Sequence, residues 1–578
     1  MNPLSPVYTE KAECQDCYKC VRECIQKAIK VSEGHAQVLP ERCVLCGHCV
    51  SVCPVGAKRV RSDNIRAESL ILRKEKVYAS LAPSFVGAFP DISPFAVAAA
   101  IERLGFAGVS ETALGAQVVS RQVASDLNEE PDSLVISSAC PTTVDLIEKY
   151  YPELCSSISD TLSPLQAHAQ MLRHLYGDDI GVVFIGPCIA KKKEADDRPD
   201  LVDAALTFEE LTEWFDRAGI DPSIIDDEGA AFVPYRAAEG AVYPIEGGMI
   251  ATLKDGAGVR DRNLLSVSGL SDVVDVLAEL SLETPPGGLF LELLACRGGC
   301  INGPKCSGAQ RNVRKRRRVL EWLPEGQSLE RDAPRWTSIR RMPAAASGLG
   351  LGSGVAVEST AHSAAEISTA LRSVGKHDRS DELNCGSCGY ETCRDFAVAL
   401  IENRAEQTMC AGYMRKLAQK KTDALLRAMP SGVVMVSKEL RVLECNRKFV
   451  QLLGEEAELL YDAAPGLDGV ELKRIVPFWR LFDEALNKDA DFVGEDISYG
   501  GRVLNGSVFV VQPGELVGGV FQDVTAPAVQ RDRIIAQAQE VITRNLSTVQ
   551  QIASLMGENA AETEAMLTSI IDAFGRPE

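Results

Sequence analysis

Apolar runs separated by helical stretches organise the first half of the chain. Three short apolar runs, at Leu134–Ile136, Val182–Ile185 and Leu289–Leu294, have the length and composition of buried strands. Helical stretches such as residues 144–151 alternate with them. This alternation predicts α/β units, in which residues at the carboxyl ends of parallel strands converge on one crevice.

The pattern changes in the second half. Gly, Ala and Ser dominate residues 343–364, which predicts a linker over about 343–380. Residues 527–574 are predicted to form a helix, because apolar residues recur there at spacings of three and four: Ile535, Ala538, Ile542, Val549, Ile552 and Met556. Asn545 interrupts this seam at one position. This seam favours a short coiled coil in which the Asn fixes the register, or a helix packed on the preceding domain.

The 19 cysteines add chemistry to these elements, starting with eight near the N-terminus. Residues 14–24 read C-x2-C-x2-C-x3-C, and residues 43–54 repeat this run and add a proline, which resembles bacterial two-cluster ferredoxins. Three thiolates on a tight loop hold three corners of a cubane, and the fourth cysteine reaches the neighbouring cluster. We therefore expect one [4Fe–4S] cluster on Cys14, Cys17, Cys20 and Cys53, and a second on Cys43, Cys46, Cys49 and Cys24. A pair of zinc sites is the alternative, although zinc ligands come as CxxC pairs with a longer gap. The segment between the runs predicts a small hairpin.

Each apolar run of the central region is followed within a few residues by a cysteine segment. SSACPT contains Cys140, PCIAKKKE contains Cys188, and ELLACRGGC contains Cys296 and Cys300. These segments resemble the three signature motifs of [FeFe]-hydrogenases. The second motif, PCxxKxxE, matches without a mismatch, and the third has Leu294 where Met is usual.

The resemblance implies that the four cysteines hold the H-cluster, a [4Fe–4S] cluster bridged through Cys300 to a di-iron subsite with CO, cyanide and a bridging dithiolate amine. It further implies heterolytic cleavage of H2. Five further residues receive implied roles at this site: Lys191 as a donor to cyanide, Glu292 as a brace for the third loop, and, at the wall of the subsite, Pro187, Ser84 and Ala139. Ala82 and Pro83 would also line the subsite. A surface charge run is the alternative for residues 191–193.

Three departures from the family pattern are informative. Ala139 occupies the position where efficient members have a cysteine that relays protons to the amine. Such relays contribute about 10²–10⁴ in rate, so we expect slow turnover. Gly186 stands where a bulky Met is usual, and Asn302-Gly303-Pro304 replaces a GGGQ-type tail, which together predict an altered outer shell. Cys306 receives no role; Cys155 and Cys445 are expected to be small core side chains.

The downstream half contains two further domains by resemblance. The pattern C-x2-C-x4-C-x16-C resembles a small four-cysteine [4Fe–4S] domain, with zinc as the alternative and with ligands Cys385, Cys388, Cys393 and Cys410. Residues 424–525 resemble a PAS domain. This segment contains no histidine, which excludes histidine-ligated haem, and Cys445 precedes Asn446, unlike the photoactive flavin type. The sequence specifies no ligand for this domain.

The chain is therefore expected to be multidomain, α/β and α+β. The predicted parts are a ferredoxin-like domain (1–62), a two-lobed α/β active-site domain (76–342), a linker (343–380), an Fe–S domain (381–412), a PAS domain (424–525) and a C-terminal helix (527–574). The net charge of −20 disfavours nucleic acid, despite the basic run at residues 311–318. No secretion signal and no apolar run of membrane-spanning length is present, so a cytoplasmic protein is expected.

Three functions fit the motifs. The first is a slow [FeFe]-hydrogenase that senses H2 or redox state and signals through the PAS domain, as a homodimer, to a separate kinase or phosphatase, because no histidine lies beyond His377. The second is a bidirectional metabolic hydrogenase. Both would exchange electrons with a ferredoxin-like partner and need hydrogenase maturation proteins. The third is a non-catalytic iron–sulfur protein related to cluster-assembly factors, against which Lys191 in an intact PCxxKxxE argues.

Overall fold

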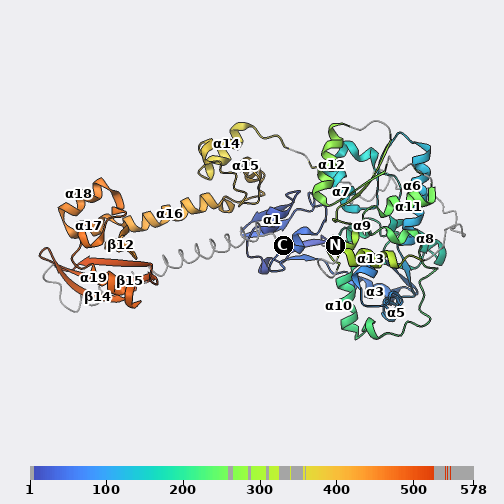
Figure 1. The fold of residues 1–578 in the computed structure, drawn as a ribbon, viewed down its shortest axis with the longest axis horizontal. Helices are drawn as coiled ribbons and strands as arrows, with labels where there is room; N and C mark the ends of the chain where they lie inside the picture. Colours follow the sequence, from blue (N-terminus) through green and yellow to red (C-terminus); the bar gives the residue numbers. More distant parts are fainter. Residues whose placement is uncertain are drawn as a thin grey trace. The chain divides into compact units, whose positions relative to one another are not determined.

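The computed structural model describes residues 5–257, 264–283, 288–306, 312–324 and 360–525, together with the separate residues 259, 339, 356–357, 540–541, 543–544 and 547. The chain divides into two compact units, Met1–Ala411 and Gly412–Glu578. Figure 1 labels the helices and strands of both. Each unit has a hydrophobic core of its own. None of the helices in the described residues is long and apolar enough to cross a membrane.

The N-terminal domain consists of two antiparallel strand pairs and two short helices. The first pair is β1 with β4, and the second is the hairpin of β2 and β3. This hairpin lies between the two cysteine runs, as the sequence predicts. In chain order the elements are β1 (Val7–Thr9), α1 (Lys19–Glu23), β2 (Ile29–Ser32), β3 (His35–Val38), α2 (His48–Ser51) and β4 (Lys58–Val60).

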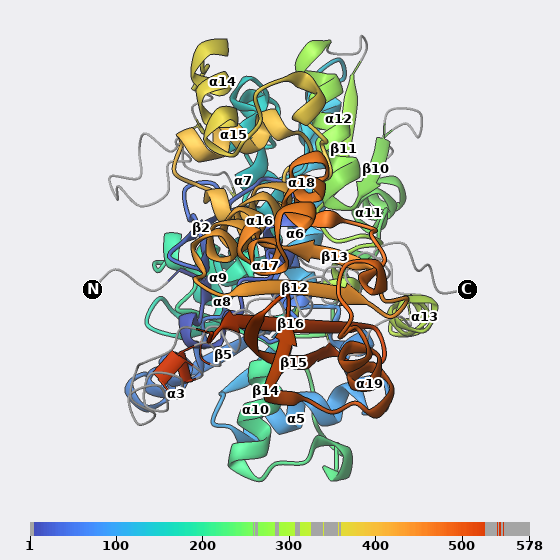
Figure 2. The ribbon, with the colours of Figure 1, turned by 90° about the vertical axis from the view of Figure 1, so that its left-hand side faces the viewer.

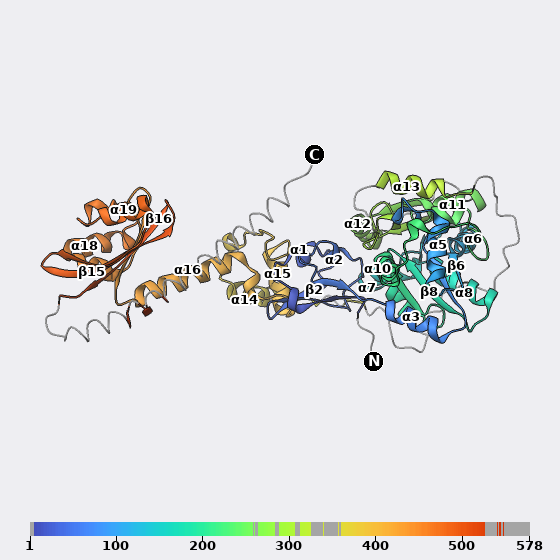
Figure 3. The ribbon, with the colours of Figure 1, turned by 90° about the horizontal axis from the view of Figure 1, so that it is seen from below.

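The first lobe of the central domain contains a four-stranded parallel sheet. Its strands are buried along their whole length, which is usual for parallel strands with helices packed around them. Figure 3 shows β6 and β8 among these helices. The spatial order of the strands is β6 (Gly108–Glu111), β5 (Val77–Leu81), β8 (Gly181–Gly186) and β9 (Ala204–Thr207). The helices of this part of the chain are α3 (Asn64–Arg73), α4 (Phe85–Ala88), α5 (Pro94–Arg103), α6 (Ala113–Glu129), α8 (Pro164–Tyr176), α9 (Ala190–Asp197) and α10 (Phe208–Ala218).

The second lobe contains a three-stranded parallel sheet. The three strands that the sequence predicts before the cysteine segments are confirmed as β7, β8 and β11, and β8 is one residue longer at each end. The spatial order in this lobe is β10 (Leu264–Ser268), β11 (Leu289–Leu294) and β7 (Leu134–Ile136). The remaining helices of the central domain are α7 (Pro141–Tyr150), α11 (Gly248–Ala257), α12 (Leu270–Leu282) and α13 (Asn312–Glu321).

A small helical domain follows, built on α14 (Ala364–Ser373) and α15 (Cys393–Ile401). Helix α14 falls inside the stretch that the sequence predicts as a linker. Its capping box, formed by Ser363 and Glu366, starts the helix, and Leu371 packs on α15, so these residues form part of the folded domain. The Gly-rich residues 343–355 lie outside the described residues.

The second unit carries a five-stranded antiparallel sheet with helices on one side, the arrangement expected of the segment resembling a PAS domain (Figure 2). Aromatic rings fill its core, where Phe449, Phe482 and Phe521 are fully buried. Cys445 is buried in the same core, as expected. The strands in spatial order are β13 (Val442–Cys445), β12 (Gly432–Ser437), β16 (Leu516–Asp523), β15 (Arg502–Gln512) and β14 (Phe492–Tyr499). The helices are α16 (Ala411–Ala428), α17 (Arg447–Leu453), α18 (Glu455–Ala463) and α19 (Arg480–Lys488). The seam predicted for 527–574 lies outside the described residues.

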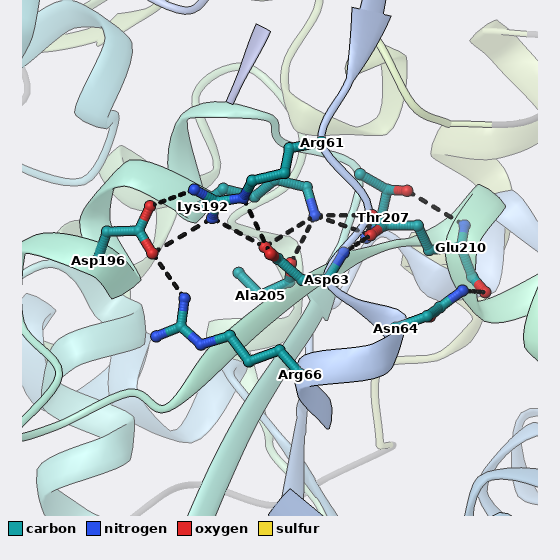
Figure 4. A network of polar contacts seen from close by, with 9 residues as sticks. All are labelled: Arg61, Asp63, Asn64, Arg66, Lys192, Asp196, Ala205, Thr207 and Glu210. Atoms are coloured by element: carbon teal, nitrogen blue, oxygen red, sulfur yellow. Dashed lines mark hydrogen bonds and ion pairs between the residues drawn. The ribbon is translucent and has the colours of Figure 1, made fainter. Parts of the chain in front are cut away.

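A buried network of charges joins the end of the N-terminal domain to helix α9 (Figure 4). The ammonium of Lys192, whose side chain is 1% exposed, lies 3.2 Å from Asp63 Oδ2 and 2.8 Å from Glu210 Oε2. Arg61 contacts Asp63 and also Asp196, at 2.9 Å and 2.7 Å. Each buried charge therefore has an opposite partner, which is the condition for keeping ions in an interior.

We expect Lys192→Met to lower the free energy of unfolding by about 3–5 kcal/mol, because buried Glu210 loses its cation while Asp63 keeps only Arg61. The matched control is Arg66→Met, which removes a cation from the same network. The Arg66 side chain is 36% exposed, and Asp196 keeps Arg61 as a partner, so the expected loss is below about 1 kcal/mol. Guanidinium unfolding measures both; equal losses would contradict the buried role of Lys192.

Candidate functional site

One pocket of the central domain is lined by all four cysteines of the three central segments. Cys140 and Cys188 follow β7 and β8, while Cys296 and Cys300 follow β11. The four side chains therefore meet where parallel strands of both sheets end, as the sequence predicts. The pocket is also lined by the other residues singled out in the sequence, which are Ala82, Pro83, Ser84, Ala139, Pro187, Lys191 and Glu292.

The segment between Cys296 and Cys300 needs glycine to present both cysteines to this pocket. Gly299 has φ of +102°, and a Cβ on it would lie 2.3 Å from the carbonyl oxygen of Pro244. A side chain at this position would therefore push the loop off the wall of the pocket. Hence the sequence Arg297-Gly298-Gly299 fixes the path of the third cysteine segment.

Burial in the pocket controls the protonation of three of its thiols, those of Cys188, Cys296 and Cys300. Burial raises the pKa of Cys188 to about 11; Cys140 nearby adds to this shift, and the Lys191 ammonium opposes it. The pKa values of Cys296 and Cys300 are raised for the same first reason, and their sulfurs lie within electrostatic reach of each other. Because a thiolate and not a thiol binds metal, iron loading at these sites must release protons.

Lys191 is held at the wall of the pocket by two side chains. Its ammonium donates to Glu194 Oε2 at 2.5 Å and to Ser163 Oγ at 3.2 Å, and Ser163 in turn donates to Glu194. An ammonium has three N–H donors, so one is left for a ligand in the pocket. Sequence reasoning assigned no role to Ser163 or Glu194; the spacing of three between Lys191 and Glu194 on a helix was the available signal for the latter.

Glu292 lies beside the pocket but braces a different element from the one expected. Its Oε1 accepts a hydrogen bond from the backbone N–H of Met249 at 3.1 Å, in the first turn of α11. A carboxylate in the first turn of a helix is favourable. The observed hydrogen bond thus runs to α11, whereas the sequence suggested the third cysteine loop. Burial raises the pKa of Glu292 to about 7.

Gly186, next to the pocket residue Pro187, and Ser84, in the pocket wall, are both constrained by their surroundings. A Cβ on Gly186 would lie 2.5 Å from the ring of Phe184 and 2.8 Å from Cβ of Ala82, so no larger side chain fits there. The Phe184 ring itself lines the pocket. Ser84 is fully buried, and its hydroxyl has no hydrogen-bond partner among the described residues, so it can donate to a polar group bound in the pocket.

The other cysteines gather in the groups that their spacing predicts. Cys20 lies within electrostatic reach of Cys14, Cys17 and Cys53. Cys49 has the corresponding relation to Cys43, Cys46 and Cys24. Cys388 has it to Cys385, Cys393 and Cys410. Cys46 also lies within reach of the pocket residue Cys296. Within the described residues, no three His, Cys, Asp or Glu side chains are close enough to hold a single metal ion.

Two remaining cysteines lie apart from these groups. Cys155 is exposed, on the turn Pro152–Ser157, so the expectation of a core side chain is wrong for this residue. Cys306 is half-buried, and its sulfur lies 3.7 Å from the ammonium of Lys315.

We expect the raised pKa of Glu292 to make stability depend on pH. Since the folded state holds the proton more tightly than the unfolded state, this stabilisation is present below about pH 4.5 and is lost as pH rises through about 7. The loss amounts to about 3 kcal/mol. Glu292→Gln removes the titrating group, so the difference in unfolding free energy between wild type and variant should change by that amount between pH 5 and pH 8. Parallel pH profiles of the two proteins would contradict the prediction.

Comparisons with known families agree with this arrangement. Residues 75–304 match the family described as iron only hydrogenase large subunit, C-terminal domain. Residues 13–57 match the 4Fe-4S dicluster domain, residues 381–411 match the FeS family, and residues 420–489 match a PAS domain.

Three curated relatives and two solved structures show how far the likeness extends. The NADP-reducing hydrogenase subunit HndD of Solidesulfovibrio fructosivorans is 28% identical over 358 residues, which cover 50% of this chain and 60% of the relative. Iron hydrogenase 1 of Clostridium pasteurianum is 26% identical over 308 residues, covering 43% and 53%. The cytosolic Fe-S cluster assembly factor NAR1 of Debaryomyces hansenii is 26% identical over 221 residues, covering 33% of this chain and 41% of the relative.

A structure of the [FeFe]-hydrogenase HydA(deltaEFG) aligns with TM-score 0.37 and 20% identity, over 45% of this chain and 88% of that one. The PAS domain of Bordetella pertussis BvgS aligns with TM-score 0.13 and 15% identity, over 22% and 97%.

The chain thus spans 60% or less of the length of each of these three curated relatives. The family matches and the folds described above agree in order along the sequence. The chain therefore contains a 4Fe-4S dicluster domain, a central domain at residues 75–304 that belongs to the iron only hydrogenase large-subunit family, a small Fe-S domain and a PAS domain.

Proposed function

We propose that this chain is a slow [FeFe]-hydrogenase that senses H2 or redox state. The observation that carries the proposal is the pocket in which four cysteines from three loops meet beside Lys191 and Ala139. Four thiols fit a cubane cluster, and the apolar lining fits a catalytic group that must be kept from water.

The residues of the pocket fit an H-cluster. Cys140, Cys188, Cys296 and Cys300 would hold its [4Fe–4S] part, with Cys300 bridging to the di-iron subsite. The unpartnered hydroxyl of Ser84 and the remaining N–H of the braced Lys191 are donors that suit cyanide ligands. When bound, the group supplies reversible heterolytic cleavage of H2, and the protein supplies ligation and electrostatics.

The side chains of this chain then set how fast protons and electrons move. Ala139 has no exchangeable proton, so the first step of proton exchange with the pocket lacks a relay at that position. Electrons would have a short route between the pocket and the N-terminal domain, because Cys46 lies within electrostatic reach of Cys296. The clusters proposed on the two N-terminal cysteine groups would connect the pocket to a ferredoxin-type partner. Slow turnover with a working electron route suits a sensor.

The second unit would provide the output of this sensor. The match of residues 420–489 to a PAS domain supports a role as a dimer or signal module. No histidine lies beyond His377, so a phosphoryl group cannot be accepted by a histidine in this half. The signal would therefore pass, from a homodimer, to a separate kinase or phosphatase. Assembly of the di-iron subsite would depend on hydrogenase maturation proteins.

Two other functions have specific support. A metabolic bidirectional hydrogenase would share the pocket, and the likeness to HndD and Iron hydrogenase 1 favours that reading. A non-catalytic assembly factor would share only the four cysteines, and the likeness to NAR1 favours it. The buried Lys191, braced by Glu194 and Ser163, argues against the assembly factor, because one of its N–H donors is left for a group bound in the pocket.

We expect infrared spectra of protein matured with the hydrogenase assembly proteins to contain CO and CN⁻ stretching bands. The proposed reason is that the four cysteines and Lys191 form a complete site for the di-iron subsite. Protein made without these assembly proteins is the control and should show iron–sulfur absorbance without such bands. A matured sample without the bands would reject both hydrogenase readings and leave the non-catalytic one.

We expect Ala139→Cys to raise the H2/D2 exchange rate of the matured protein, because the new thiol restores a proton relay beside Cys140. General acid–base relays contribute about 10²–10⁴ in rate, which sets the size of the expected gain. Ala139→Val is the matched control, since it adds a side chain without an exchangeable proton. An equal rate in all three proteins would sink the relay explanation, and a fast wild type would favour the metabolic reading.

A further inference from the structure

The four-cysteine domain is in direct contact with helix α1 of the N-terminal domain. Arg22 Nη1 donates to the carbonyl oxygen of Ser387 at 3.4 Å. Gly389 has φ of +90°, and a Cβ on it would lie 2.9 Å from Cγ1 of Val21. Ser387 and Gly389 flank Cys388, so the loop that carries this cysteine follows the surface of α1 closely.

A second set of contacts fixes the same two domains. The backbone N–H of Val31, in strand β2, donates to the carbonyl oxygen of Arg404 at 2.9 Å. Arg42 and Glu402 form an ion pair at 3.5 Å, with side chains 22% and 19% exposed. A hydrogen bond between two backbones leaves little freedom, so the separation between the cysteine groups of the two domains is set by the fold.

Lys27 is held against the segment of α1 that contacts the four-cysteine domain. Its ammonium donates to the carbonyl oxygens of Val21 and Arg22, at 3.4 Å and 3.1 Å, which holds the charge in place. The sulfurs of Cys24 and Cys388 both lie within electrostatic reach of it, as do the carboxylates of Glu391 and Glu23. Cys24 belongs to the cysteine group beside the pocket, and Cys388 belongs to the group of the four-cysteine domain.

We propose that Lys27 couples the iron–sulfur clusters held by these two cysteine groups, so that an electron leaving the pocket passes to the four-cysteine domain. The step is the transfer of one electron from a reduced cluster to an oxidised one; no bond forms or breaks, and no proton moves. A fixed positive charge beside both clusters lowers the energy of the added electron on either. The proposal rests on the proposed function for H2 as the source of the electron.

The position of the second group gives the transfer a consequence. Cys410, one of its four cysteines, is followed directly by α16, the helix that leads into the PAS domain. A cluster that takes up an electron beside Cys410 would change the charge next to the first turn of this helix. The four-cysteine domain is thereby the electron acceptor nearest in sequence to the proposed output.

The first test is a redox titration of the full chain with reconstituted iron–sulfur clusters and no di-iron subsite, using dithionite and electron paramagnetic resonance. We expect Lys27→Gln to lower the reduced-to-oxidised ratio of both cluster signals at least tenfold at a fixed potential, which is a shift of about 59 mV for one electron. Lys30→Gln, three residues along, is the matched control and should shift neither. A shift of one signal alone, or of none, would overturn the proposal.

The second test separates the two domains. Gly389→Val places a side chain against Val21 and should abolish the magnetic interaction between the two reduced clusters, with iron content unchanged. A wild type whose reduced clusters give non-interacting signals would contradict the proposal. If the variant binds less iron, the Lys27→Gln titration still decides. Because dithionite replaces H2 and the di-iron subsite is absent, neither result depends on hydrogenase activity.

Discussion

Helix α9 joins three parts of the first unit through the consecutive lysines Lys191–Lys193. Lys191 donates to Ser163, just before α8, and pairs with Glu194 of α9 itself. Lys192 pairs with Asp63, just before α3, and with Glu210 of α10, and Lys193 lies 3.3 Å from Asp145 on α7. Because a buried ammonium is costly without a carboxylate, the pairs that reach another element help to specify where that element lies. Cys188 lies two residues before α9 and Cys140 directly precedes α7, so the ion pair between these two helices helps to set the positions of two pocket cysteines.

Burial of the pocket thiols has an energetic cost. Low polarity raises the pKa values of Cys188, Cys296 and Cys300, whereas metal binding needs thiolates. The positive charge of iron must therefore offset the cost of four buried negative sulfurs, with Lys191 as the nearby protein cation.

Several features of the pocket depend on residues that no motif identifies. Ser163 fixes Lys191 from a different segment of the chain, and the Phe184 ring fills the space beside Gly186. The interpretation of residues 191–193 as a surface charge run is wrong for the first two lysines, which are buried. Glu292 braces α11, because its strand passes the start of that helix and periodicity does not encode such a crossing.

The sequence by itself determined the order of the domains, the three strands before the cysteine segments and the grouping of the cysteines. These features are local, since hydrophobic periodicity and cysteine spacing are written into short stretches of chain. Only the tertiary structure decided which residues orient Lys191, how Lys192 anchors the N-terminal domain, and that Lys27 lies within electrostatic reach of cysteines from two groups. Those contacts join segments far apart in sequence, and their partners are chosen by packing geometry and by the need to pair every buried charge.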